Sequence, residues 1–177
     1  MAADPLFTVA FPDFDADARA CVQALRERHD PQAALIEAHF TLIFGVSEVS
    51  QADYLAHVAA VARVSAPIDL RCSRVQPWAG PGDAEVYLFL QPDEGREAIT
   101  ELHDRLCRGP LATQLRPELP YLPHITLGRV QGRARAQALC DEMNAQSREF
   151  CGRLNTLTVV ALRQQRIEPL AGFRLGA

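Results

Sequence analysis

Two short stretches of the sequence carry the same polar residues at the same spacing. His39-Phe-Thr41-Leu and His124-Ile-Thr126-Leu both have the form His-x-Thr-Leu, and they lie 85 residues apart (124 − 39). Composition alone predicts roughly 0.02 copies of this tetrapeptide in such a chain, so two copies are very improbable by chance. In a strand, residues i and i+2 point to the same side, roughly 7 Å apart, so each histidine shares a face with its threonine.

Two imidazoles and two hydroxyls suit chemistry on a phosphodiester. With an unperturbed pKa of about 6.5, one imidazole can accept a proton from water while a second, protonated one donates to the leaving oxygen. Threonine hydroxyls can donate to the phosphate oxygens and stabilise the charge that develops on them. If both motifs face one cleft, they form such a site, and the residues alone do not decide which histidine is the acid. The other histidines lie on predicted helices or helix ends, where a structural role is more common: His29, His57 and His103.

Apolar periodicity predicts the elements that would position these motifs. Strands are expected at 6–11, 39–45, 68–76, 84–90, 124–130, 154–162 and 166–175, and helices at 15–29, 50–65, 94–108 and 133–149. Residues 76–83, rich in Gly and Pro, are expected to form a loop, and Phe40, Leu42 and Phe44 to face the core. The order repeats approximately in the two halves. It predicts an α+β fold in which two pseudo-symmetric lobes, each a small antiparallel sheet backed by helices, enclose a cleft. We expect a single domain over 1–177, with the lobes interleaved in the chain.

Composition limits the classes of protein and of partner. Hydrophobic residues make up 48% and charged residues 23%, as in globular proteins, and the net charge of −4 argues against bulk binding of polyanions. All 18 basic residues are arginine, whose planar group suits phosphate. The five cysteines form no CxxC pair, which indicates reduced thiols. We find neither a secretory signal nor a membrane-spanning stretch, and we expect a cytoplasmic protein with no obligate protein partner.

Other classes of site lack their motifs in this sequence. One imidazole nitrogen per strand is too few for zinc, and neither a GxSxG nucleophile elbow nor a phosphate-binding P-loop is present. We therefore predict neither metal nor cofactor. The alternative from another class is a non-catalytic protein that binds RNA ends or a nucleotide in the same cleft. Two titrating groups favour an enzyme, since a binding protein does not need them.

The motifs and their surroundings resemble the two-histidine phosphoesterase superfamily, in its branch of 2′-5′ RNA ligases and RNA 2′,3′-cyclic phosphodiesterases. HFTLIFG at 39–45 and PHITLGR at 123–129 are similar to the family's two motifs, and 159–175 to its last two strands. The resemblance implies metal-independent hydrolysis of the 2′,3′-cyclic phosphate ends of RNA, or of small cyclic nucleotides, to a 2′-phosphate, in some members with the reverse ligation. It also implies the site roles: His39 as proton donor, His124 as proton acceptor, and Thr41 and Thr126 as phosphate-binding residues.

Three further residues are candidates for substrate binding. The resemblance implies that Arg129 lies near the phosphate, although strict alternation turns it away from the histidines unless a bulge at Gly128 re-aims it; a strand-end arginine in solvent or in a salt bridge is the alternative. Tyr121 and Trp78 can stack on a base or simply pack. A basic collar for a long RNA would draw on Arg71, Arg74 and Arg116. The acidic net charge fits a small cyclic nucleotide at least as well.

Overall fold

The structure, a computed structural model, describes residues 4–80, 84–115, 118 and 120–177. Its elements are β1 (Leu6–Ala10), α1 (Ala16–His29), β2 (Phe40–Val46), α2 (Gln51–Arg63), β3 (Ile68–Ala79), β4 (Glu85–Glu94), α3 (Arg96–Leu106), the 3-10 helix η1 (Gly109–Gln114), β5 (Ile125–Gln131), α4 (Arg133–Ala145), β6 (Phe150–Leu154), β7 (Thr156–Arg163) and β8 (Arg166–Arg174). The predicted α+β class and order of elements are confirmed, with one strand added.

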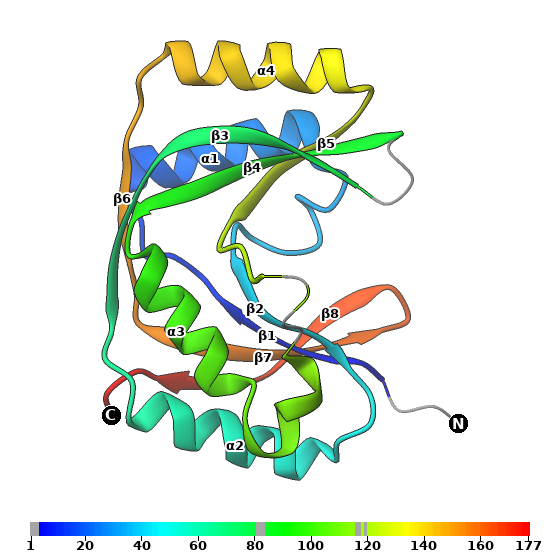
Figure 1. Ribbon diagram of the computed structural model, residues 1–177, viewed down its shortest axis with the longest axis vertical. Helices are drawn as coiled ribbons and strands as arrows, with labels where there is room; N and C mark the ends of the chain where they lie inside the picture. Colours follow the sequence, from blue (N-terminus) through cyan, green and yellow to red (C-terminus); the bar gives the residue numbers. More distant parts are fainter. Residues whose placement is uncertain (1–3, 81–83, 116–117, 119) are drawn as a thin grey trace.

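The strands form a single curled antiparallel sheet in the order β6-β3-β4-β5-β2-β1-β7-β8. Its two four-stranded halves meet between β5 and β2, where one residue pair, Phe40 with Ile125, joins them. Figure 1 shows the halves diverging from this junction. Helices α1 and α4 pack on β3, β4 and β5, whereas α2 packs on β7 and β8 and α3 on β2 and β4. The two expected sheets are therefore halves of one sheet, and each half is backed by helices.

Two strand assignments differ from the sequence-based prediction. Strand β6 went unpredicted because it is only five residues long and buries just Phe150 and Leu154, too few to reveal an alternation. Strand β3 continues to Ala79, into the segment that was expected to be a loop, because Trp78 and Ala79 pair with Tyr87 and Val86 of β4. Trp78 therefore lies on a strand.

The apolar faces of the two motif strands are largely as predicted. Four residues are fully buried: Phe40, Leu42, Ile125 and Leu127. The prediction that Phe44 belongs to the core is wrong, since 55% of it is exposed. The β1–β2 register shifts on both sides of Thr8, so Ile43 joins Leu42 in the core and Phe44 is left outside.

Two histidines, one buried and one partly buried, are hydrogen-bonded to backbone carbonyls. His103 Nδ1 donates to the Leu42 carbonyl (2.7 Å), and His57 Nε2 donates to the Leu106 carbonyl (2.9 Å). These two histidines thus have the structural role that was expected of them.

The five cysteines are free thiols. Across the described ranges, no helix has both the length and the apolar character needed to cross a bilayer.

Helix α1 approaches β5 most closely at Gly128. A Cβ atom at this position would lie 2.6 Å from the Cβ of His29 and 3.1 Å from its carbonyl oxygen. Neither atom is the far end of a flexible side chain, so the helix would have to move away from the sheet. Only glycine allows this packing distance.

We therefore expect Gly128→Ala to lower the free energy of unfolding by about 1–3 kcal/mol, as overpacking does. Urea denaturation measures the difference. Gly172→Ala is the matched control, because its Cβ would make only an ordinary contact, 3.5 Å from Thr156 Cγ2. Equal stability of the two variants would contradict the close approach.

Candidate active site

The β2–β5 junction brings the two motifs onto one face of the sheet. Phe40 pairs with Ile125, and both are fully buried on the opposite face. In an antiparallel pair, continuing this register by one residue in each direction places the motif residues opposite one another: His39 with Thr126, and Thr41 with His124. All four are half-buried. The two halves of the sheet thus contribute one histidine and one threonine each to a common surface.

Both imidazoles are held by the same kind of hydrogen bond. Nδ1 of His39 lies 2.7 Å from the carbonyl oxygen of Glu37, and Nδ1 of His124 lies 2.7 Å from that of Leu122. A carbonyl oxygen only accepts, so each Nδ1 carries a proton. Each Nε2 is therefore left for another partner, as an acceptor when the ring is neutral and as a donor when it is charged.

Burial makes His124 a weak base in the free protein. Its pKa is lowered to about 4, mainly by desolvation and to a smaller extent by the nearby His39, against the opposing effect of the Leu122 carbonyl. The ring of Phe89 covers it, with 3.6 Å between centroids and 19° between the planes. No carboxylate contributes to this pKa, so His124 is neutral at pH 7.

The surroundings of His39 differ in one respect. Burial lowers its pKa, the Glu37 carbonyl raises it, the Arg26 guanidinium lowers it and the Asp30 carboxylate raises it. Phe11 contacts the ring edge-on at 6.1 Å. The charges of Arg26 and Asp30 thus oppose each other at His39, with the effect of Arg26 the larger. The pKa of His39 is lowered less than that of His124, so His39 is the ring that more readily carries a proton.

A bulge turns Arg129 toward the histidine face. Arg129 pairs with Tyr87 and Gly128 with Leu88, but the next pair is Thr126 with Phe89, so β5 carries one extra residue. Arg129 consequently shares the face of Thr126, despite the odd spacing between them. Its Nη1 also lies 3.6 Å from a carboxylate oxygen of Glu85, a loose and partly exposed contact.

An aromatic row leads away from His124. Trp78, 47% exposed, stacks on Phe89 with centroids 6.0 Å apart, and Phe89 in turn stacks on His124. Tyr87 also stacks on Phe89, at 5.6 Å. Sequence reasoning missed Phe89, although the alternation of Tyr87 and Phe89 was visible, because nothing in the sequence shows which strand lies beside β5.

Tyr121 is engaged within the protein. Its hydroxyl donates to the Thr41 carbonyl (2.9 Å), and its ring stacks on His103 with centroids 4.0 Å apart. The hydroxyl and one face of the Tyr121 ring are therefore engaged within the protein. Packing was the alternative to stacking on a base. The bond also links the segment before His124 to the strand of the other motif.

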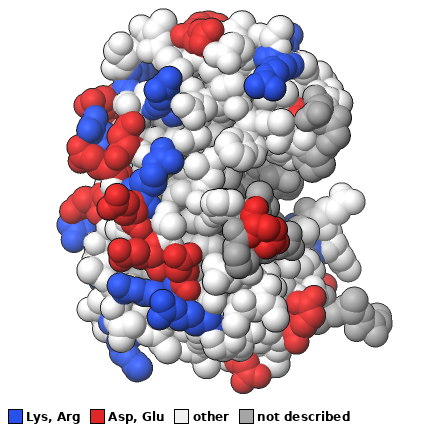
Figure 2. Space-filling model, in the orientation of Figure 1, with Lys and Arg blue, Asp and Glu red and all other residues white. Residues whose placement is uncertain are grey.

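Two of the three arginines expected to form a basic collar lie in the part of the chain that the structure describes. Arg71 is bound by Glu94 (2.7 Å) and Glu149 (2.9 Å), Arg74 is exposed on β3, and Arg116 lies outside the described residues. Figure 2 shows acidic and basic side chains intermingled on the left, over the outer strands and α3. In the part of the chain that the structure describes, Arg71 is therefore neutralised by its neighbours.

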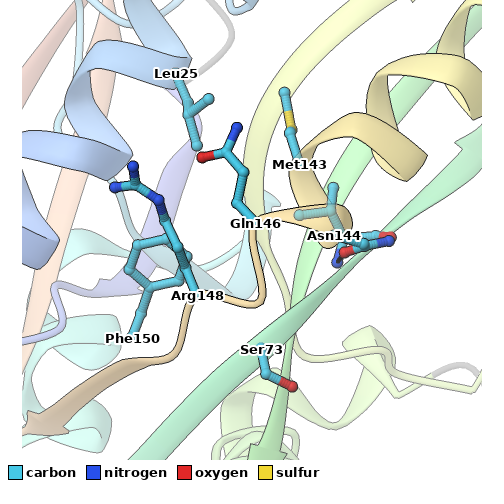
Figure 3. Close-up of a pocket in the computed structure, with 8 residues that line it drawn as sticks. Leu25, Ser73, Met143, Asn144, Gln146, Arg148 and Phe150 are labelled. Carbon is cyan, nitrogen blue, oxygen red and sulfur yellow. Dashed lines mark hydrogen bonds between the residues drawn. The ribbon is translucent and has the colours of Figure 1, made fainter.

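A separate small pocket lies between α1, α4 and β3. Figure 3 shows its lining, which includes Leu25, Met143, Arg148 and Phe150 but neither motif histidine. At its edge, the Asn144 amide exchanges two hydrogen bonds of 2.9 Å with the backbone of Val75, beyond the point where β6 stops pairing with β3. Among the described residues, no three His, Cys, Asp or Glu side chains gather as metal ligands would.

The lowered pKa of His124 makes the stability depend on pH. Its folded value of about 4 lies below 6.5, so between these pH values the unfolded chain binds the proton more readily and acidification destabilises the fold. We expect His124→Gln to lose less free energy of unfolding between pH 6.5 and 4 than the wild type, by about 3 kcal/mol at most. Urea denaturation at several pH values tests this, and parallel curves would contradict it.

Comparison with known proteins identifies the family of this chain. Residues 12–166 match the profile of the 2′-5′ RNA ligase superfamily. A "Putative phosphoesterase" of Bacillus pumilus is 31% identical over 106 residues, 59% of this chain and 58% of that protein. A "Putative phosphoesterase" of Geobacillus kaustophilus is 29% identical over 106 residues, with the same two shares. The chain thus spans about 58% of the length of these curated relatives.

Solved structures share the fold at low sequence identity. E. coli LigT complexed with 3′-AMP has a TM-score of 0.62 and 20% identity, and the match covers 98% of this chain and 99% of that one. Usb1 of Kluyveromyces marxianus has a TM-score of 0.55 and 10% identity, over 95% and 98% of the two chains. With most of its length matched by the family profile, the chain belongs to the 2′-5′ RNA ligase superfamily, which confirms the resemblance drawn from its paired motifs.

Proposed function

We propose that this protein is a metal-independent phosphodiesterase that opens 2′,3′-cyclic phosphates to 2′-phosphates. One observation carries the proposal: both histidines have Nδ1 bonded to a carbonyl and Nε2 without a partner among the described residues, at a junction where each lies opposite a threonine in the pairing register. Two proton-transfer groups and two donors around one small space match the needs of a phosphoryl centre. Nothing in this arrangement requires a metal ion.

In the proposed reaction, His124 is the base and His39 is the acid. Nε2 of neutral His124 takes a proton from water as the water oxygen bonds to phosphorus. Nε2 of protonated His39 gives its proton to the departing 3′ oxygen as the bond from phosphorus to that oxygen breaks. Thr41 and Thr126 donate to the non-bridging oxygens throughout. The same steps, with the 5′ hydroxyl of a second ribose in place of water, would form a 2′-5′ linkage and release the 3′ hydroxyl, which is 2′-5′ ligation.

The electrostatic surroundings support this assignment of roles. His124 lies under Phe89, no carboxylate acts on it, and its pKa is lowered to about 4, so it is ready to accept a proton. The pKa of His39 is lowered less, and the Asp30 carboxylate offsets part of the lowering by Arg26, so His39 carries a proton more readily than His124. An anionic phosphate bound between the rings would raise the pKa of both histidines and protonate His39 first.

The shape and charge of the surface favour a short substrate. Arg129 offers one positive charge on the histidine face, already shared with Glu85. A long RNA would need several such charges along its backbone. Trp78 offers an exposed ring in line with Phe89 and His124, suited to stacking on a nucleobase. We therefore expect a small cyclic nucleotide or a short RNA end, and the LigT complex with 3′-AMP is a nucleotide precedent within this fold.

Hydrolysis of 2′,3′-cyclic AMP in the presence of a chelator tests the proposal. We expect release of 2′-AMP, identified by 31P NMR, with a loss of roughly 100- to 10,000-fold in kcat/KM for both His39→Ala and His124→Ala. A second substrate, an oligonucleotide with a 2′,3′-cyclic phosphate end, should react no faster and with little dependence on salt. His57→Gln is the control, because its amide can replace the bond to the Leu106 carbonyl.

Three results would contradict the proposal. Tight binding of both substrates without turnover would support the alternative, a non-catalytic RNA-end or nucleotide-binding protein. Activity that appears only on addition of a divalent metal would exclude the metal-free mechanism. A strong preference for the oligonucleotide, with a steep loss of rate in salt, would overturn the short-substrate part alone.

A further inference from the structure

A buried ion pair lies at the end of α1. Nε and Nη2 of Arg26 donate to one carboxylate oxygen of Asp30, at 3.0 and 2.8 Å, and only 2% and 5% of the two side chains are exposed. Removing both charges from water costs free energy that their attraction repays only in part, so such a pair is weak evidence for a stabilising role. This raises the question of what else the pair does.

Its remaining bonds hold the segment that follows the helix. Nη1 of Arg26 donates to the carbonyl of Ile36 (2.8 Å), and the second oxygen of Asp30 accepts from the amide of Gln32 (2.9 Å). The amide of Asp30 also closes the last turn of α1 by donating to the Arg26 carbonyl (2.7 Å). One ion pair thus fixes both ends of the stretch from Asp30 to Ile36.

That stretch leads directly to the first motif. The carbonyl that Arg26 binds belongs to Ile36, and the next carbonyl along the chain, that of Glu37, accepts from His39 Nδ1. Any movement of the Ile36 peptide unit would therefore move the acceptor that fixes the His39 ring. We propose that Arg26 and Asp30 are positioning residues that hold the Glu37 carbonyl in place and, through it, the orientation and tautomer of His39. The consequence for activity rests on the proposed function, whereas the consequence for the ring does not.

The charges that face His39 give the pair a second effect. They come from Arg26 on α1 and Asp30 at its end. The other groups that face His39 are the ring of His124, which is neutral at pH 7, the Glu37 carbonyl and the ring of Phe11. Arg26 lowers the pKa of His39 and Asp30 raises it. Removal of one member should thus shift this pKa in the direction opposite to removal of the other, which loss of packing alone would not do.

The second motif has an anchor at the same distance. Ile36 lies three residues before His39, and Tyr121 lies three residues before His124. Tyr121 is fixed by the bond from its hydroxyl to the Thr41 carbonyl. Each histidine thus follows an anchored residue and then a residue whose carbonyl binds its Nδ1, and Arg26 provides the anchor in the first motif.

Nitrogen-15 NMR of the imidazoles in the full chain tests the inference. In the wild type, neutral His39 should carry its proton on Nδ1. In Arg26→Met we expect a mixture of tautomers and a raised His39 pKa, and in Asp30→Asn a lowered pKa, each with a roughly 10- to 100-fold loss in kcat/KM for 2′,3′-cyclic AMP. The control is Arg19→Met, on the same helix as Arg26, which breaks an exposed ion pair with Asp13. It should leave the tautomer and pKa of His39 and the value of kcat/KM unchanged.

A folded Arg26→Met or Asp30→Asn protein with an unchanged His39 tautomer and pKa would overturn the inference. If Arg26→Met does not fold, Asp30→Asn decides, because the amide keeps the volume of the side chain and an acceptor for Gln32. If the wild type does not hydrolyse the cyclic nucleotide but the His39 signals shift as described, the positioning role stands and the proposed function fails.

Discussion

A single backbone pairing, Phe40 with Ile125, fixes the relative position of the two motifs. The sheet is continuous only through this pair, and its halves diverge on either side, so the residues next to it are the ones that remain close. A slip of one residue in either strand would turn the histidine of that strand into the core and bring its buried neighbour, Phe40 or Ile125, to the surface. The burial of those two residues is therefore what keeps the histidines on the same face, and the Tyr121 bond to Thr41 reinforces it.

Around that junction the protein combines symmetry with one asymmetry. The bond from Nδ1 to the carbonyl two residues earlier has the same length in both motifs, 2.7 Å, so the free nitrogens are presented in the same way. The surroundings then separate the rings: Phe89 covers His124, whereas Asp30 and Arg26 lie near His39. A reaction that takes one proton and gives another requires two groups with unequal proton affinities, and the two histidines meet this requirement.

The sequence predicts the part of this site that depends on local pattern. The repeated motif and the shared face of each histidine and threonine follow from spacing along one strand. The direction of Arg129 does not, because strict alternation turns it away and the bulge that re-aims it lies in the pairing of β4 with β5. What depends on neighbouring strands was missed or wrong: the contact of Phe89 with His124, the exposure of Phe44 beside a shifted register, and the place of Trp78 on β3. The Arg26–Asp30 pair had only helical spacing to mark it, and such spacing usually indicates a surface salt bridge.

The most direct measurement of the shared site is a titration of the 15N-labelled imidazoles with 2′-AMP, the proposed product. If one phosphate lies between the two rings, the Nε2 signals of His39 and His124 should shift together, with one dissociation constant, while both Nδ1 atoms keep their protons. A shift in only one histidine, or two different dissociation constants, would show that the motifs do not act on the same phosphate and would contradict the shared acid–base site.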